Sequence, residues 1–186
     1  MTDEEIQQEY KVIEQAKNEP AAFGVLYEKY FNRIFSFIYN QTDNEELTAD
    51  LCSQTFLLVL NNLKRFEFRG FPVSAWFYRI AANEVNKHYR KNNAQKIFSL
   101  EEKRLRELLQ QEEDYSEELI GQLLNFMKEL PTDMLEVLQL RFFESKDFKE
   151  IAFILDITES GAKMRTYRAL DHLRKKFNVK IKYGKE

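Results

Sequence analysis

The sequence has very few of the residues that disulfides, metal sites and nucleophilic active sites require. Its 186 residues include one cysteine, Cys52, and two histidines, His88 and His172. A single cysteine excludes an internal disulfide, and these three side chains are too few for a zinc site of the cysteine and histidine type. We expect neither a metal nor a cofactor. With no nucleophile placed beside a base, we also expect that the protein is not an enzyme.

Glycine and proline are scarce as well, with five and three residues respectively. So few turn-forming residues disfavour a sheet protein, and a glycine-rich phosphate-binding loop is excluded. Each of the three prolines, Pro20, Pro72 and Pro131, stands just before a long stretch of helical periodicity, where a proline in the first turn costs no hydrogen bond. The composition therefore predicts an all-α protein.

Long apolar runs are also missing. The longest stretches, such as residues 56–60, fall far short of the roughly 18 residues that a membrane span needs. The first five residues carry no basic and apolar signal pattern. We expect a cytoplasmic protein without membrane insertion.

Charge, in contrast, is plentiful and unevenly distributed. Residues 1–19 have a net charge of −4 and residues 101–118 of −5, whereas residues 163–182 reach +7, although the whole chain has only −3. The acidic middle stretch has a single aromatic residue, Tyr115, and is interpreted as a linker. We predict two small helical domains, residues 1–95 and 116–186, joined by an acidic linker over residues 96–115.

Apolar residues recur every three or four positions in the first half, which is typical of helices that bury one face. We predict an acidic N-terminal helix and further helices from Pro20 to Asn40, after Asp43, and from Pro72 to about Asn92. The expected buried positions of the second helix are Phe23, Leu26, Tyr27, Tyr30, Phe31, Ile34, Phe37 and Ile38. Those of the third are Leu47, Leu51, Thr55, Leu58 and Leu63, and a polar segment from Arg65 to Gly70 ends it.

In the second half, we predict helices over residues 119–130, 132–143, 148–155 and 158–177, of which the last two are short and separated by residues 156–158. Residues 148–170 have the pattern of a helix-turn-helix: Ala152 is small where two helices cross, Ile157 fills the turn, and Thr158 caps the next helix. The inward positions of that helix are predicted to be Ala162, Ala169, Leu170 and Leu173. Ser160, Lys163, Arg165 and Arg168 are predicted to point outward, toward the major groove of DNA. The alternative is an ordinary helical hairpin with a solvated basic face.

The helix that follows Pro72 mixes aromatic and basic residues. Five polar and cationic side chains share one face by their spacing, namely Arg79, Asn83, Asn86, Lys87 and Arg90. Cations can hold a phosphate backbone while amides read an exposed base, which suits single-stranded DNA. For Trp76, Ile80 and Tyr89 we expect simple packing in the core.

Taken together, these segments resemble the bacterial sigma-70 family, in its small extracytoplasmic-function (ECF) class. The resemblance covers nearly the whole chain, and the motifs that carry it follow the family's order. They are Ala22-Phe23-x-x-Leu26-Tyr27-x-x-Tyr30, Asp50-Leu51 with Phe56-Leu57, Trp76-Phe77-Tyr78-Arg79-Ile80-Ala81 with Asn83, and Leu130-Pro131 with Glu136-Val137-Leu138 leading into the helix-turn-helix.

The resemblance implies an RNA polymerase sigma factor that directs promoter recognition, promoter melting and transcription initiation. The first domain would bind the polymerase clamp through Asp50, Ser53, Gln54 and Leu57, and the minus-ten element through Arg79, Asn83, Asn86, Lys87 and Arg90. The second would bind the minus-thirty-five duplex through Thr158, Ser160, Lys163, Arg165 and Arg168, and the linker would enter the polymerase channels. The implied partners are core RNA polymerase, promoter DNA and an anti-sigma factor.

The sequence departs from the family pattern at two of these places. Ser53-Gln54 stands where the family usually has Gln-Glu. In the helix-turn-helix, Ser160-Gly161 replaces the more common Gly-Thr, and Met164 precedes Arg165 where a serine is usual. The main rival interpretation is a regulator that binds duplex DNA through its helix-turn-helix without melting it. An interaction bundle that binds a sigma factor would not need the eight basic residues between positions 163 and 182.

Overall fold

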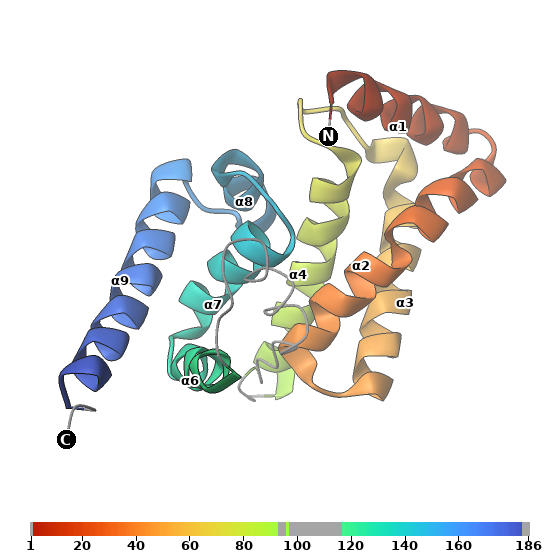
Figure 1. Ribbon diagram of the computed structural model, residues 1–186. Helices are drawn as coiled ribbons and strands as arrows, with labels where there is room; N and C mark the ends of the chain where they lie inside the picture. Colours follow the sequence, from red (N-terminus) through yellow and green to blue (C-terminus); the bar gives the residue numbers. More distant parts are fainter. Residues whose placement is uncertain (1, 93–95, 97–116, 184–186) are drawn as a thin grey trace. The chain divides into compact units, whose positions relative to one another are not determined.

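A computed structural model describes residues 2–92, residue 96 and residues 117–183, with side chains placed through residue 177 (Figure 1). All regular structure in these residues is helical, in agreement with the predicted class. The chain divides into two compact units, and along the sequence the division falls after residue 97. Apart from Lys96, the predicted acidic linker lies outside the described residues.

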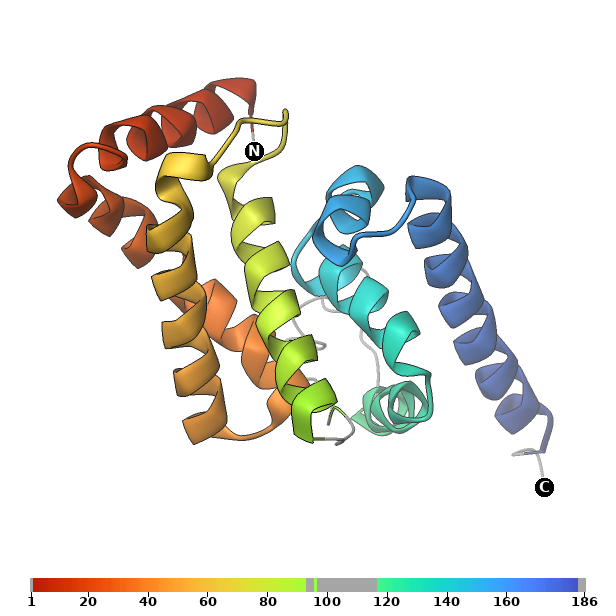
Figure 2. The ribbon, with the colours of Figure 1, turned by 180° about the vertical axis from the view of Figure 1, so that it is seen from behind.

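The described residues of the first unit form four α-helices and two 3₁₀ turns. They are α1 (Asp3–Ala16), η1 (Pro20–Phe23), α2 (Gly24–Thr42), α3 (Glu45–Asn62), η2 (Leu63–Arg65) and α4 (Val73–Asn92). Helices α2, α3 and α4 pack on one another, and α1 packs against η1, α2 and α4 (Figures 1 and 2). The helices predicted from periodicity are therefore present, with Pro20 in the 3₁₀ turn that leads into α2.

Aromatic side chains fill the core of the first unit. The Tyr30 and Phe77 ring centroids are 5.5 Å apart, and those of Phe37 and Tyr78 are 5.0 Å apart, both edge to face. Such pairs are favourable beyond the area that they bury. Cys52 is fully buried in the same unit, and burial raises the pKa of its thiol to about 11.

The prediction of burial was wrong for Tyr27, which is 41% exposed. Its ring lies over Phe56 of α3 with a centroid distance of 4.8 Å, so it covers the core from outside. Phe31 of α2 and Leu47 and Leu58 of α3 are only half-buried, while Leu51, Thr55 and Leu63 are buried as expected.

The second unit contains α6 (Glu117–Lys128), α7 (Thr132–Leu138), the π-helical turn η3 (Gln139–Phe143), α8 (Phe148–Leu155) and α9 (Glu159–Tyr183). Its core includes Met127, Leu130, Leu135, Leu138, Ala169 and Leu173. The last helix is not short, because α9 continues over 25 residues. None of the helices in the described parts of the chain has the length and apolar character that a bilayer crossing requires.

Candidate nucleic-acid interface

The sequence-predicted face of α4 is present as one continuous surface. Asn83, Asn86, Lys87 and Arg90 are exposed, and Arg79 is half-buried at the start of the same stripe. The opposite face of the helix is buried in the unit and carries Val73, Ala75, Phe77, Tyr78, Ala81, Ala82 and Val85. Burial of one face thus fixes the direction of the other, and the polar stripe is presented by a rigid helix.

Lys87 of this stripe has a partner within its own helix. The Lys87 ammonium lies 3.1 Å from a carboxylate oxygen of Glu84, one turn earlier on α4. The Lys87 side chain is 63% exposed, whereas that of Glu84 is only 11% exposed, so the ammonium group stays accessible at the surface while its partner lies at the buried side of the helix.

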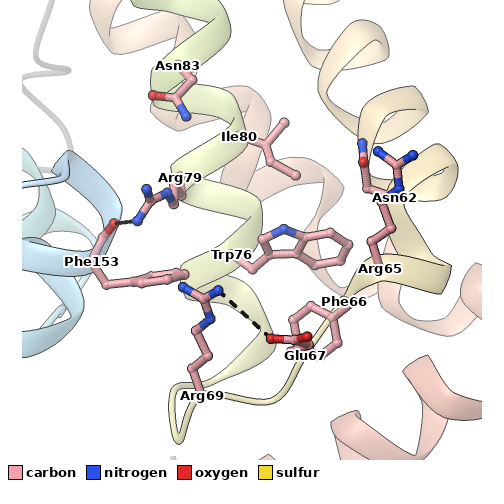
Figure 3. A pocket seen from close by; sticks show the side chains of 10 residues that line it. All are labelled: Asn62, Arg65, Phe66, Glu67, Arg69, Trp76, Arg79, Ile80, Asn83 and Phe153. Atoms are coloured by element: carbon pink, nitrogen blue, oxygen red, sulfur yellow. Dashed lines mark hydrogen bonds and ion pairs between the residues drawn. The ribbon is translucent and has the colours of Figure 1, made fainter.

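Beside the stripe lies a hollow that the sequence did not reveal (Figure 3). Trp76 and Asn83 of α4 line it together with Arg65, Phe66 and Arg69 from the segment after α3. The Phe66 and Trp76 ring centroids are 4.6 Å apart. Aromatic rings beside arginines and an amide can stack on a base and hold its phosphates.

Trp76 therefore differs from the prediction of simple core packing. It is half-buried and lines the hollow, where its ring packs against Phe66 of the 65–69 segment. Ile80 lines the same hollow, whereas Tyr89 is buried as predicted. The sequence signal for this site is the run Arg65-Phe66-Glu67-Phe68-Arg69, in which aromatic and charged residues alternate. From the sequence, this segment was predicted only to end the preceding helix.

The four residues expected to bind polymerase lie on one face of α3. Asp50, Ser53, Gln54 and Leu57 are all exposed, at the three- and four-residue spacing of a single stripe. Leu57 is 58% exposed, and Leu60, which the sequence reasoning missed, is 39% exposed beside it. The two leucines lie close together on the helix and form an apolar patch of the kind that can bind another protein.

In the second unit, the helix-turn-helix is formed by α8, the turn 156–158 and α9. Asp147 and Glu150 form a capping box at the start of α8, and Asp156 ends this helix in the left-handed conformation with φ +56°. The Thr158 hydroxyl accepts a hydrogen bond from the Gly161 backbone N–H at 3.0 Å, so the predicted cap of α9 is confirmed.

The inward face of α9 is made by Ala162, Thr166, Ala169 and Leu173. Leu170 was predicted to point inward but is 39% exposed. Its place in the buried stripe is taken by Thr166, whose hydroxyl donates to the Ala162 carbonyl at 3.0 Å and needs no other polar partner in the core.

The residues of the helix-turn-helix that were predicted to point outward differ in exposure and in their ion pairs. Thr158, Ser160, Lys163 and Arg168 are exposed. Arg165 is half-buried, with its Nε 3.5 Å from a carboxylate oxygen of Asp133 in α7. Lys163 pairs with Glu159 at 2.7 Å, and this hydrogen bond raises the pKa of Lys163.

Two large apolar side chains lie on the outward face of α9 beside the predicted contacts. Met164 is 49% exposed and Tyr167 is 63% exposed. They lie between the basic residues, where an apolar group can contact the methyl group of a thymine in the major groove. Their three-residue spacing, out of phase with the buried stripe, was visible in the sequence.

A helical bundle with a polar and cationic helix face, followed by a helix-turn-helix with a basic outer face, is typical of a DNA-binding protein of transcription. The chain matches sigma-70 region 2 over residues 26–95 and sigma-70 region 4 over residues 126–175. It belongs to the sigma-70 family, in the ECF class of RNA polymerase sigma factors.

Relatives of known function extend the match beyond these two regions. The chain is 28% identical over 164 residues to the ECF RNA polymerase sigma factor BldN of Streptomyces coelicolor, with 86% of this chain and 62% of BldN covered. It is 30% identical over 159 residues to the RNA polymerase sigma factor YlaC of Bacillus subtilis, with 81% and 88% covered.

A solved structure shares the fold. The sigma factor RpoE of Bartonella quintana, in complex with the anti-sigma factor NepR, superposes with a TM-score of 0.62 at 18% identity, covering 84% of this chain and 97% of the other. The protein is accordingly a non-enzymatic transcription initiation factor, and its helix-turn-helix binds DNA.

Proposed function

We propose that the chain divides promoter recognition between two domains with the boundaries predicted from the sequence. Residues 1–95 would bind the polymerase clamp and the melted minus-ten element, and residues 116–186 would bind the minus-thirty-five duplex, with the acidic residues 96–115 as linker. The observation that carries this proposal is the exposed polar stripe of α4 beside the hollow at Trp76. A regulator that only binds duplex DNA through its helix-turn-helix would not need a polar helix face beside an aromatic hollow.

In the first domain, Asn83 would read one extruded base of the minus-ten element, while Arg79, Asn86, Lys87 and Arg90 hold the backbone of the melted strand. Extruding a base costs a few kcal/mol in lost stacking and pairing, which a pocket and phosphate contacts must offset. Asn83 lies on the rim of the hollow, where its amide can both donate and accept. Trp76 and Phe66 offer aromatic surfaces for stacking beside it.

In the second domain, Thr158 and Ser160 lie at the N-terminal end of α9, the part of a recognition helix that meets base edges. Lys163, Arg165 and Arg168 follow along the helix and would contact phosphates. A phosphate that binds Arg165 must compete with Asp133, and one that binds Lys163 must compete with Glu159, so Arg168 should make the strongest of the three contacts.

Core RNA polymerase would contact the α3 face formed by Asp50, Ser53, Gln54 and Leu57. The acidic N-terminus and linker repel DNA while the basic C-terminal segment attracts it, so promoter binding is expected to be weak until the protein joins the polymerase. We further propose an anti-sigma factor as a partner, as RpoE has in its complex with NepR. The exposed Leu57 and Leu60 would then be covered in either complex. The cytoplasm is the proposed location, since the polymerase works there.

The test is run-off transcription with purified core polymerase and a promoter library. Initiation that depends on both a minus-ten and a minus-thirty-five sequence is the expected result. Duplex binding without any initiation would instead support a regulator and overturn the proposal. A quadruple variant of the α3 face, with Asp50, Ser53, Gln54 and Leu57 each changed to alanine, should abolish initiation while leaving binding of the isolated minus-thirty-five duplex unchanged.

A further inference from the structure

Helix α1 contacts the segment that lines the hollow at Trp76. The Lys17 ammonium donates a hydrogen bond to the backbone carbonyl of Phe66 at 3.1 Å. The Tyr10 ring lies with its centroid 5.1 Å from that of Phe68 and 6.4 Å from that of Phe66. Two residues on one face of α1 therefore contact a segment more than 45 residues away in the sequence.

The contacted segment has little internal structure of its own. Residues 66–69 lie outside the helices, and Gly70 has φ +77°, a conformation that favours glycine. The Phe66 N–H is bound to the carbonyl of Leu63, which closes the preceding 3₁₀ turn. The Lys17 contact thus supplies a tertiary anchor to a stretch that no helical ladder supports.

The side chains of Tyr10 and Lys17 both interact with the carboxylate of Glu14. The Lys17 ammonium lies 2.7 Å from a carboxylate oxygen of Glu14, and this interaction lowers the pKa of Glu14. A hydrogen bond to the same carboxylate raises the pKa of Tyr10. Positions 10, 14 and 17 follow the spacing of one helix face, so Glu14 links the other two residues.

Helix α1 is itself firmly attached to the bundle. Ile13 and Ala16 are buried. Glu9 is buried too and accepts a hydrogen bond from the Tyr30 hydroxyl, while the Lys29 ammonium lies 2.8 Å from it. The face formed by Tyr10, Glu14 and Lys17 therefore belongs to a rigid support rather than to a loose terminus.

Phe66 connects this support to the hollow. Its backbone carbonyl is held by Lys17, while its ring packs against Trp76 with a centroid distance of 4.6 Å. Arg65 precedes it directly and Arg69 follows three residues later, and both line the hollow. A shift of the Phe66 backbone would move the aromatic wall and both arginines together.

We propose that Tyr10, Glu14 and Lys17 of α1 are positioning residues that hold the 65–69 segment in the place where it shapes the hollow and thereby sets the minus-ten base preference. This inference rests on the proposed function of the α4 face. The residues that line a binding site must be held in place by residues behind them, and α1 supplies those residues here. The N-terminal helix would thus affect promoter choice without touching DNA.

The test uses the full-length protein and the variant Lys17→Met, which keeps an unbranched apolar stem but loses the donor. Lys11→Met is the matched control, because Lys11 is exposed on the same helix and the charge change is identical. Lys17→Arg, which keeps a donor and the charge, should restore wild-type behaviour. Tyr10→Ala serves as a second variant from the same face.

Two readouts are needed, and the first does not involve DNA. Trp76 is the only tryptophan in the sequence, so acrylamide quenching of its fluorescence reports on the hollow alone. The second readout is initiation from templates with each of the four bases at every minus-ten position. We expect Lys17→Met to increase quenching and to reduce the preference at one or two minus-ten positions by roughly fivefold, the effect of one hydrogen bond. Lys11→Met should change neither.

The possible failures are distinguishable. Unchanged Trp76 quenching in both Lys17→Met and Tyr10→Ala would overturn the role of α1 and leave the proposed α4 site intact. Increased quenching with unchanged base preference would also overturn it, provided that Asn83→Ala still alters the preference. If quenching increases but neither Lys17→Met nor Asn83→Ala alters any preference, the proposed function of the hollow itself is wrong.

Discussion

The Tyr89 hydroxyl donates a hydrogen bond to the backbone carbonyl of Gln41 at 3.0 Å and so joins the last turns of α4 and α2. Gln41 lies at the end of a helix, where carbonyls have no partner within the helix. Asn86 and Arg90, which flank Tyr89 on α4, belong to the exposed stripe. The bond therefore fixes the C-terminal part of the proposed DNA-binding face.

Tyr89→Phe is expected to lower the free energy of unfolding of the first unit by about 1 kcal/mol, because it removes one buried hydrogen bond and little volume. Urea unfolding followed by circular dichroism would measure the change. Tyr27→Phe is the control, since Tyr27 is 41% exposed and the same substitution there should alter stability very little. Equal effects in the two variants would show that the Tyr89 bond contributes nothing.

Asn83→Ala should keep the fold and the affinity for polymerase, because an exposed asparagine in a helix is slightly less favourable than alanine. It should nevertheless lose roughly 1–3 kcal/mol of discrimination at one base of the minus-ten element. Initiation from templates with all four bases at each position measures this. Asn61→Ala, at an exposed asparagine of α3, is the matched control. Wild-type preference at every position would reduce Asn83 to a surface residue.

Arg168→Ala should lower the salt dependence of binding to the minus-thirty-five duplex by about 0.9 in slope if the contact is to one phosphate. Arg165→Ala should have a smaller effect, since Asp133 already neutralises part of that charge. Asp133→Asn should then raise the affinity. Fluorescence anisotropy at several salt concentrations provides the slopes, with Lys128→Ala on α6 as control. Unchanged slopes in both arginine variants would place the recognition face elsewhere.

Met164 offers a test of base recognition that needs no change of sequence in the promoter. If its side chain packs on a thymine methyl group, replacing that thymine by uracil should weaken binding of the wild-type protein several-fold. The same replacement should have no effect on Met164→Ala. A uracil scan of both strands of the minus-thirty-five duplex measures this. Equal sensitivity of the two proteins at every position would exclude Met164 as the contact.

A fragment of residues 1–95 should fold on its own and melt cooperatively, because the first unit has its own aromatic core. Circular dichroism during heating is the measurement. The full chain provides the reference for helical content. An unfolded fragment would show that the proposed division into two domains is wrong.

The helices and the directions of their faces could be predicted because burial in a helical bundle repeats every three or four residues. This is why the stripe from Arg79 to Arg90 and the cap at Thr158 were found. Leu170 was misplaced because an apolar residue was preferred over Thr166, whose hydroxyl is satisfied within its own helix. Assigning buried positions from the spacing of apolar residues takes hydrophobicity into account but not a hydrogen bond within the helix.

The hollow at Trp76 could not be predicted, for a different reason. The 65–69 segment has no period. Its position depends on Lys17 and Tyr10, which are distant in the sequence, and on Trp76 of the next helix. Trp76 itself was assigned to the core since most tryptophans are largely buried. Only the three-dimensional arrangement shows that the segment after α3 turns back over α4 at this point.

The buried thiol of Cys52 makes the natural protein well suited to fluorescent labelling. Maleimide dyes react with accessible thiolates, whereas this thiol is fully covered and its pKa is raised to about 11. A cysteine introduced by Asn86→Cys would therefore be labelled selectively, with the native cysteine left in place. A dye at position 86 would follow the arrival of the melted strand in real time during promoter opening.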